Sequence, residues 1–376
     1  MDYIKLCDVC DFQCGSQPPK DEWSFTPKDG YVRMLQIRDF TQGERVIPEY
    51  IKLTNTTKIC EADDILIARY GASLGKILTG LSGAYNVAIM RTIPNTELLE
   101  KKYLYYYLKA PVFQNFLLRI GNRAAQAGFN KNDLQELLIP CVSRERQKEV
   151  VCILEKVETL ICALKQQLQK LDELVKARFI EMFDNWEYNT VRLGNVCTKI
   201  TDGTHKTPNY LDAGVPFISA KNIVNGKIDF SDIKYISEKE YMDIQKRCRT
   251  ELNDVLLTKS GSLGTPAIVK TSNRIGLFES LAVIKYDRTK LTPEFLCEQL
   301  KTERIQRQFR TGTKGVAIKH LHLGVIADVE IIVPDIERQN QFAAFVKQVD
   351  KLRIAVQKAL DETQMLFDSL MQKYFE

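Results

Sequence analysis

The stretch Asp63-Asp-Ile-Leu-Ile-Ala-Arg-Tyr-Gly-Ala-Ser-Leu-Gly75 returns later in the chain as Asn253-Asp-Val-Leu-Leu-Thr-Lys-Ser-Gly-Ser-Leu-Gly264. Each copy holds a short apolar run of the kind that forms a buried strand, followed by a cation and a glycine-bounded loop. The copies lie about 190 residues apart, far beyond the 20–50 residues of solenoid repeats. The sequence therefore predicts one large duplicated unit.

A second pair of matches stands before two long helical patterns. Pro140, with Glu-Arg-Gln at 145–147, returns as Pro334 with Glu-Arg-Gln at 337–339. Because a helical pattern without interior Gly or Pro follows each match, we interpret the repeated unit as a lobe plus a helix. The expected parts are a first lobe at 1–143, a helical spacer at 144–184, a second lobe at 185–335 and a helical spacer at 336–376.

The composition is that of a soluble globular protein. The chain of 376 residues is 44% hydrophobic and 27% charged, which allows two or three domains with their own cores. No run approaches 18 apolar residues, and the segment Met1–Lys5 opens no signal-peptide core. We therefore expect a cytoplasmic protein without a membrane span, whose cysteines are reduced thiols. The net charge of +5 is compatible with a polyanionic partner without requiring one.

The two lobes show the same order of expected elements, which indicates an α+β fold with two mixed α/β lobes. In the first lobe we expect strands at 32–37, 64–69 and 87–91, a helix at 98–118, a loop at 121–128 and a strand at 137–140. In the second lobe we expect strands at 215–219, 255–259 and 282–285, a helix at 293–309, a loop at 311–315 and a strand at 329–334.

The helical spacers carry heptad seams, because their apolar residues recur at alternating steps of four and three. The second seam has two polar members, Arg353 and Thr363. The apolar members are Val150, Leu154, Val157, Ile161, Leu164, Leu168, Leu171 and Val175 in the first spacer, and Phe342, Val346, Val349, Val356, Leu360, Phe367, Leu370 and Tyr374 in the second.

Two arrangements fit these seams. Each helix could lie separately on its own lobe, but matched seams of equal length favour pairing with each other. Since the first helix leads out of the first lobe and the second returns from the second lobe, pairing predicts an antiparallel coiled coil with a pseudo-two-fold axis. Residues 145–184 would form a helix of about 60 Å at 1.5 Å per residue.

Patterns that would signal catalysis are incomplete. The segment at 71–76, Gly-Ala-Ser-Leu-Gly-Lys, is one residue short of a P-loop, and Ile77 stands where Ser or Thr would hold Mg²⁺. Cys7, Cys10 and Cys14 have no second ligand pair at zinc spacing. The histidines at 205, 320 and 322 accompany no recognisable nucleophile, and no methyltransferase tetrapeptide is present. We expect a non-catalytic chain that holds no metal or cofactor.

Binding side chains, in contrast, recur at matching positions of the two lobes. Arg and Lys bind guanine edges or phosphate, and Asn and Gln pair with adenine, so this set suggests DNA contacts. For any one of them a solvated surface role explains the residue equally well. The candidates are Arg33, Gln36, Arg38, Arg69, Tyr70, Lys76, Arg123, Gln126, Asn130 and Lys131 in the first lobe, and His205, Lys206, Thr207, Ser219, Lys221, Asn222, Lys259, Ser260, Ser262, Lys314, Lys319 and His320 in the second.

The chain resembles the specificity (S) subunits of Type I restriction–modification systems along its whole length. The resemblance is carried by Asp202-Gly-Thr-His-Lys-Thr-Pro208, by Gly214-Val-Pro-Phe-Ile-Ser219 with Asn222-Ile223, by the repeated glycine loops, and by the Pro and Glu-Arg-Gln pairs. The first lobe departs from this pattern, because it reads Gln13-Cys-Gly-Ser-Gln-Pro-Pro19 without a histidine. His205 is therefore no general requirement of both lobes.

The resemblance implies two target recognition domains that read a bipartite DNA site, and a coiled coil that separates them. It also implies two modification (methyltransferase) subunits, which would use S-adenosylmethionine to methylate adenine, and restriction (translocase/nuclease) subunits for cleavage. Two other function classes stay open. The chain could be an adaptor that bridges two proteins without DNA, or, with less support, an enzyme with a cryptic site.

Overall fold

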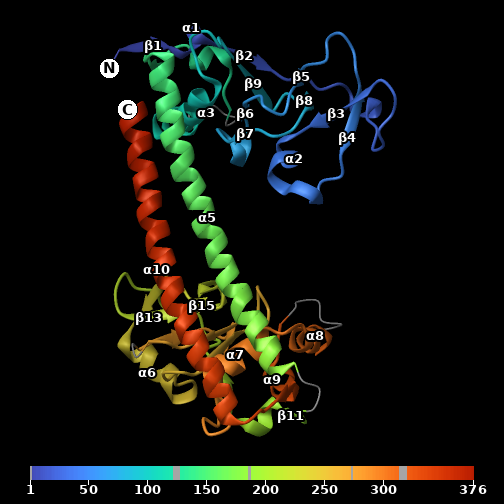
Figure 1. The fold of residues 1–376 in the computed structure, drawn as a ribbon. Helices are drawn as coiled ribbons and strands as arrows, with labels where there is room; N and C mark the ends of the chain where they lie inside the picture. The colour runs from blue at the N-terminus through green and yellow to red at the C-terminus, as the bar shows by residue number, and fades with distance from the viewer. Residues whose placement is uncertain (1, 122–127, 185–187, 272–273, 313–319) are drawn as a thin grey trace. The chain divides into compact units, whose positions relative to one another are not determined.

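The computed structural model describes residues 2–121, 128–184, 188–271, 274–312 and 320–376. The chain divides into two compact units (Figure 1). Unit 1 comprises Met1–Lys165 with Lys358–Glu376, and unit 2 comprises Gln166–Gln357. The units thus differ from the four expected parts, because each unit joins one lobe to a section of both spacer helices.

Unit 1 contains two four-stranded sheets, in the orders β2-β9-β6-β7 and β4-β3-β8-β5, and the short pair β1-β10. All pairings are antiparallel except β3 with β8. The strands are β1 (Tyr3–Lys5), β2 (Cys10–Cys14), β3 (Tyr31–Leu35), β4 (Glu49–Lys52), β5 (Ile59–Cys60), β6 (Leu66–Ala68), β7 (Ile77–Leu78), β8 (Gly83–Tyr85), β9 (Ile89–Pro94) and β10 (Leu138–Pro140). The helices of this lobe are α1 (Leu6–Val9), α2 (Ile37–Gln42), α3 (Lys101–Lys109) and α4 (Pro111–Gly121).

Unit 2 repeats the first of these sheets in full and the second with three strands. Its sheets have the orders β12-β20-β17-β18 and β16-β13-β19, with a parallel pair β13-β19, and the pairs β11-β21 and β14-β15. The strands are β11 (Thr190–Arg192), β12 (Cys197–Asp202), β13 (Val215–Ile218), β14 (Ile223–Val224), β15 (Lys227–Ile228), β16 (Lys234–Ile236), β17 (Val255–Thr258), β18 (Pro266–Ile268), β19 (Gly276–Leu277), β20 (Leu281–Tyr286) and β21 (Glu330–Ile332). The helices are α6 (Glu238–Arg247), α7 (Pro293–Lys301), α8 (Glu303–Gly312) and α9 (Leu323–Asp328). The repeated strand orders confirm the predicted duplication.

The single helices expected at 98–118 and 293–309 are each two helices, so that part of the prediction is wrong. In the first lobe the break falls at Ala110, which is extended (ψ 151°) because Pro111 disfavours the helical conformation of the residue before it. In the second lobe no proline causes the break. Thr302 is extended (ψ 146°) there, and its hydroxyl donates a hydrogen bond to the carbonyl of Gln299 at 2.7 Å.

The two long helices are α5 (Arg144–Phe183) and α10 (Ile336–Phe375). Every predicted apolar seam residue is buried or half-buried. In unit 2 the helices run antiparallel, because Phe179 contacts Phe342 with ring centroids 5.5 Å apart while Asp172, earlier in α5, pairs with Arg353, later in α10, at 2.6 Å. That ion pair explains how the seam accommodates Arg353. Among the described residues, no helix is long and apolar enough to cross a membrane.

In unit 1 the first half of α5 shares a core with the last turns of α10. Val150 and Leu154 belong to the same buried cluster as Met371 and Phe375. The chain ends meet there, since the Tyr3 hydroxyl donates a hydrogen bond to the main-chain carbonyl of Glu376 at 3.0 Å. This contact places the two ends of the chain side by side in unit 1.

A buried glutamine holds the start of each long helix. The Gln147 amide accepts from the main-chain nitrogen of Glu100 (2.7 Å) and donates to the carbonyls of Leu98 (2.9 Å) and Val142 (3.0 Å). Gln339 repeats this pattern: it accepts from Thr292 and donates to the carbonyls of Lys290 and Pro334. Because both amides satisfy main-chain groups that are shielded from water, they fix each helix to its lobe. This role explains why glutamine is the third residue of both Glu-Arg-Gln segments.

Candidate nucleic-acid interface

Four loop segments of the second lobe converge at one end of the sheet β12-β20-β17-β18. The main-chain nitrogen of Lys259 donates to Ser280 (2.8 Å), and that of Leu321 donates to the carbonyl of Lys259 (2.9 Å). The nitrogen of Glu279 donates to the carbonyl of Thr204 (3.0 Å). These bonds bring the Asp202–Pro208 segment, the second glycine loop, the β19–β20 turn and the residues around Leu321 into one surface, which we call the second-lobe loop cluster.

A glycine in each lobe makes this convergence possible. A Cβ atom on Gly203 would lie 2.1 Å from the carbonyl oxygen of Leu277, and one on Gly15 would lie 2.2 Å from that of Asn86. Real Cβ atoms do not approach oxygen so closely, so only glycine fits. Since Gly15 and Gly203 occupy matching places, the departure of the first lobe from the Asp-Gly-Thr-His pattern preserves the close backbone approach and changes only the side chains around it.

A buried ion network supports the loop cluster. The Asp202 carboxylate pairs with the Lys259 ammonium and with the Arg247 guanidinium, both at 2.5 Å. Asp202 and Lys259 have side chains that are only 4% exposed. Burial raises the pKa of the Asp202 carboxyl, but the hydrogen bond and charge of Lys259, with the charges of Arg247 and His205, outweigh burial and lower that pKa overall. The network therefore holds a charged carboxylate beneath the surface.

Arg69 occupies the corresponding place in the first lobe. Its main-chain nitrogen donates a hydrogen bond to the carbonyl of Ala88 (2.9 Å), just as the main-chain nitrogen of Lys259 donates to the carbonyl of Ser280. The Arg69 guanidinium donates to the carbonyls of Phe129 (3.0 Å) and Val87 (2.9 Å) instead of to a carboxylate. Each lobe thus has a buried cation that joins its glycine loop to neighbouring segments. The partners of this cation are main-chain carbonyls in the first lobe and a carboxylate in the second.

The structure therefore corrects the prediction that three of the candidate residues contact DNA. Arg69, Lys259 and Asn222 are at most 7% exposed. The Asn222 side chain caps the turn after β13 by accepting from the Ser219 nitrogen, and it donates to the carbonyl of Asp232. The polar atoms of these three side chains are directed to partners inside the lobe. Their burial therefore contradicts the prediction that they contact DNA directly. These residues shape the loops that present other side chains.

The remaining described candidates reach solvent, and several bind neighbours within the chain. Lys221 pairs with Asp232 at 3.2 Å, and Lys131 pairs with Asp11. Those exposed are Arg38, Tyr70, Lys76, Asn130, Lys131, His205, Lys206, Thr207, Lys221 and Ser262, and those half-buried are Arg33, Gln36, Ser219, Ser260 and His320. Arg123, Gln126, Lys314 and Lys319 lie outside the described residues.

Three of the first-lobe candidates form a separate group. Arg33 pairs with the buried Asp39 at 2.7 Å. Arg38 pairs with Glu49, whose carboxylate also accepts from Gln36 at 2.5 Å. The group therefore lies on β3, on α2 and at the residue between them. In the described part of the chain, no hydrogen bond or ion pair joins it to the glycine loop around Arg69.

The glycine loops themselves are built alike. Gly75 and Gly264 have φ values of +80° and +77°, where a side chain would be strained. Their carbonyls accept hydrogen bonds from the amides of Gln114 (2.9 Å) and Gln306 (2.8 Å), which come from the helices α4 and α8. Nothing in the local sequence pattern singles out these glutamines, because it does not indicate a partner 39 or 42 residues away.

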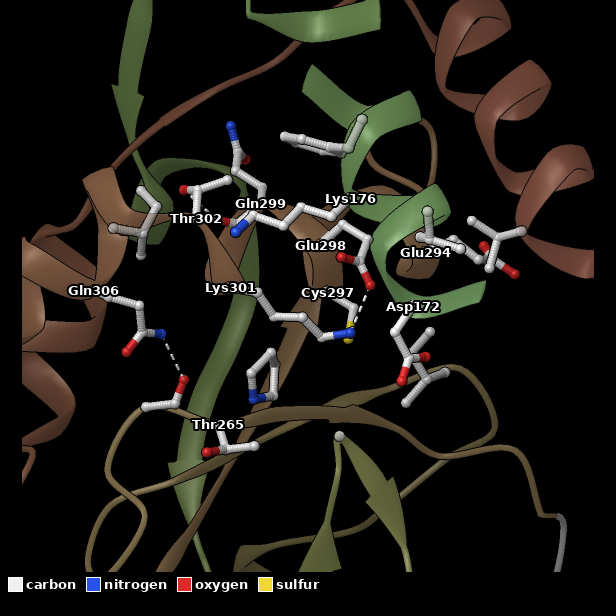
Figure 2. Close-up of a pocket in the computed structure, with 18 of the residues that line it drawn as sticks. Asp172, Lys176, Thr265, Glu294, Cys297, Glu298, Gln299, Lys301, Thr302 and Gln306 are labelled. Atoms are coloured by element: carbon white, nitrogen blue, oxygen red, sulfur yellow. Dashed lines mark hydrogen bonds and ion pairs between the residues drawn. The ribbon is translucent and has the colours of Figure 1, made fainter. Parts of the chain in front are cut away.

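Unit 2 also has a groove of about 1800 Å³ between α5, α7, α8 and α10 (Figure 2). Phe179 and Ile180 of α5 and Ile354 of α10 line it together with polar residues. Figure 2 shows the Lys301 ammonium beside the Glu298 carboxylate, a pair at 2.5 Å. None of the described DNA-binding candidates lines the groove, but Gly264 and Thr265 of the second glycine loop do, so the groove adjoins the loop cluster.

Metal ligation finds no support in the described ranges, which contain no group of three or more His, Cys, Asp or Glu side chains placed to hold an ion. The cysteines are free thiols. Burial raises the pKa of the Cys10 thiol to about 12, so this residue of the Cys7–Cys14 cluster is a protonated core side chain at neutral pH.

Comparison with known proteins identifies the architecture. The Type I restriction modification DNA specificity domain matches residues 1–173 and again residues 184–363. The chain belongs to this family. It is a specificity subunit with two target recognition domains, and proteins of this kind are non-catalytic. Each match includes a lobe together with much of the helix that follows it, in agreement with the duplicated lobe-plus-helix unit.

Individual relatives of this specificity subunit are distant. The MjaVIII specificity subunit of Methanocaldococcus jannaschii is 22% identical over 86% of this chain and 80% of its own length. The EcoBI specificity subunit of Escherichia coli is also 22% identical, over 93% of this chain and 80% of its own.

Two solved structures share its fold. A chain from a type I R-M system, solved to explain complex assembly and conformational transition, covers 99% of this specificity subunit and 97% of its own length at 18% identity, with a TM-score of 0.59. The S subunit from M. genitalium covers 100% and 96% at 16% identity, with a TM-score of 0.54.

Proposed function

We propose that this specificity subunit reads an asymmetric, bipartite site in double-stranded DNA, with one half-site for each lobe. The observation that carries the proposal is the combination of a repeated scaffold with different loop side chains. Two pairs of matching glycines give the loops of both lobes a similar backbone conformation: Gly15 with Gly203, and Gly75 with Gly264. A protein with two identical readers would favour a palindrome, whereas two unlike readers favour unlike half-sites.

The differences fall on loop residues that are exposed in the first lobe and half-buried in the second. Tyr70 stands beside the first glycine loop where the second lobe has Ser260, and Lys76 follows that loop where the second has Thr265. Tyr70 is 40% exposed, and the Arg69 guanidinium lies 4.9 Å from its ring centroid. The first lobe thus offers an aromatic ring and a lysine where the second offers two hydroxyls, so the two loop sets present different hydrogen-bonding groups to a base pair.

DNA binding by the complex of this chain with its methyltransferase should depend steeply on salt. A reader that neutralises 6–10 phosphates loses about 10³–10⁵ in affinity between 50 and 200 mM salt, because condensed counterions are released on binding. Titration of a fluorescent duplex at several salt concentrations measures the slope, and the methyltransferase without this chain is the control. An adaptor that bridges proteins would give no DNA binding dependent on this chain at any salt, which would refute the proposal.

We further propose that modification subunits dock on the long helices and, at the methyltransferase site, use S-adenosylmethionine to methylate an adenine that is flipped out of the duplex. Restriction subunits would join the same complex for cleavage. The groove of unit 2 supports a protein partner, since about 1800 Å³ exceeds the roughly 300–1,000 Å³ of small-molecule pockets. Ile180 (46% exposed) and Ile354 (71% exposed) present apolar surface there, as expected of an interaction site.

Ile354→Glu should weaken capture of the methyltransferase subunit at least about tenfold, because a carboxylate would be placed against an apolar partner surface without a counter-charge. Co-purification and titration calorimetry of the two purified proteins measure the effect. Ile47→Glu is the matched control, because Ile47 is also 71% exposed but lies in the first lobe and not in the groove. Equal affinities of both variants would show that the groove is not the docking surface.

A further inference from the structure

An acidic residue lies within the second-lobe loop cluster, where the sequence pattern predicted cations and polar donors. Glu279 belongs to the turn between β19 and β20, and its side chain is 26% exposed. A carboxylate facing DNA repels phosphate groups. On a surface that binds the duplex, it is therefore favourable only where it accepts hydrogen bonds from a base.

The position of Glu279 is held tightly. Its nitrogen donates to the carbonyl of Thr204 at 3.0 Å, and the next residue, Ser280, is 6% exposed. The Ser280 hydroxyl accepts from the Ala220 nitrogen at 2.9 Å, while its carbonyl accepts from Lys259. Because side chains that read bases need a rigid support, this turn provides the preorganisation that a specificity residue requires.

Two histidines flank the carboxylate. His320 Nε2 lies 3.6 Å and His205 Nδ1 lies 4.0 Å from Glu279 Oε2. Both separations exceed the 2.7–3.2 Å of a normal N–H···O bond. Within the described ranges the Glu279 carboxylate accepts no hydrogen bond, so its oxygens are available to a ligand. The cluster therefore presents an acceptor next to two potential imidazole donors.

We propose that Glu279 reads a C·G base pair in the half-site of the second lobe by accepting a hydrogen bond from the exocyclic N4 amino group of cytosine. The inference rests on the DNA recognition proposed above and deepens it. In the major groove a C·G pair presents the N4 donor of cytosine beside the O6 and N7 acceptors of guanine. Glu279 matches the donor, and an imidazole N–H of His320 or His205 matches an acceptor.

Adenine fits this arrangement less well. Its edge offers the N6 donor directly beside the N7 acceptor, a pattern matched by Asn or Gln, which carry both a donor and an acceptor. An ionised glutamate has only acceptors, so one of its oxygens would face N7. The carboxylate therefore selects cytosine over adenine, although both bases carry an exocyclic amino group.

The first lobe lacks this acceptor. Val87 precedes Ala88 there as Glu279 precedes Ser280, and the carbonyls of Ala88 and Ser280 accept the matching hydrogen bonds from Arg69 and Lys259. Val87 is 45% exposed and has no polar side-chain atom. The cytosine contact consequently belongs to one half-site only.

The test is methylation of a random-sequence duplex library by the full chain assembled with its methyltransferase, followed by sequencing of the methylated fraction. With wild-type chain we expect one C·G pair of the second half-site to be fixed. Glu279→Ala should lower the preference at that single position at least about tenfold, and leave the other half-site and the spacer unchanged. Glu279→Gln, which keeps the side-chain volume, should shift the position towards A·T. Asp328→Asn, at an exposed ion pair with Arg192, is the control and should leave the motif unchanged.

The outcomes separate the two proposals. If wild-type complex methylates no defined motif, the proposed function fails. If wild-type has a motif and neither Glu279 variant alters it, only the role of Glu279 is refuted. Relaxation at an A·T position refutes the cytosine assignment. If Glu279→Ala assembles poorly with the methyltransferase, the motif methylated with Glu279→Gln decides whether Glu279 reads the C·G pair.

Discussion

Asp202→Ala is expected to destabilise the second lobe by about 3–5 kcal/mol, the usual cost of removing one partner from a buried ion pair. The Lys259 side chain is 4% exposed and pairs with Asp202 at 2.5 Å, so the substitution leaves its ammonium buried with no carboxylate. Arg247, on the surface side of Asp202, loses the same partner. Denaturant unfolding followed by circular dichroism gives the free energy, and hydrogen exchange of peptides from unit 2 locates the loss.

Two variants and a pH profile sharpen this experiment. Asp232→Ala removes the partner of Lys221, but that pair is exposed on both sides and should cost no more than about 1 kcal/mol. Asp202→Leu combined with Lys259→Met should recover most of the loss, because no buried charge remains. A loss for Asp202→Ala no larger than that for Asp232→Ala would contradict the assignment of a buried network.

The pH dependence follows from the lowered pKa of Asp202. Because the folded state binds this proton less readily than the unfolded chain, the stabilisation is fully present above the unfolded value of about 3.9 and is lost as the pH falls through the lower folded value. Wild-type stability should therefore fall more steeply below about pH 4 than that of Asp202→Asn. Parallel acid unfolding curves would contradict the charged network.

Deleting one heptad from each long helix is expected to abolish methylation of the original site and to change the permitted spacer while both half-site sequences stay the same. Removal of residues 161–167 and 354–360 shortens each helix by about 10 Å, the length of roughly three base-pair steps. Seven residues are close to two helical turns, so the seam residues on either side of the deletion keep their facing within about 20°.

Methylome sequencing of a host that carries this variant with its methyltransferase measures the spacer. Insertion of one heptad into each helix at the same place is the matched control and should change the spacer in the opposite direction. Methylation of the original site by the shortened chain would show that the helices do not set the distance between half-sites. A variant that changes a half-site sequence would count against independent reading by the two lobes.

Much of the architecture followed from local patterns. The repeated Asp63–Gly75 stretch indicated the duplication, and the matching sheet orders bear it out. The steps of four and three predicted helical seams, and those side chains are buried or half-buried along α5 and α10. Such features could be predicted because a strand or a helix shows its buried face within a few consecutive residues.

The individual binding residues could not be predicted in the same way. Arg69 and Lys259 have the chemistry of DNA contacts, yet both are buried. No sequence pattern indicates Glu279 as a binding residue, although its carboxylate lies near His205 and His320 in the loop cluster. Exposure depends on which distant segments cover a side chain, and no spacing rule supplies that information.

The sequence by itself determined the duplication, the kinds of elements, the seams of the long helices and, through the repeated motifs, the family. Only the tertiary structure decided which cations are internal, why Gln147 and Gln339 recur, and that the Glu279 carboxylate lies in the second-lobe loop cluster. The physical reason is that these properties arise between segments far apart in the chain. Lys259 meets Asp202 across 57 residues, and Gln339 meets Thr292 across 47. A local pattern encodes the face that a residue turns to the core, whereas folding selects the partner that it finds there.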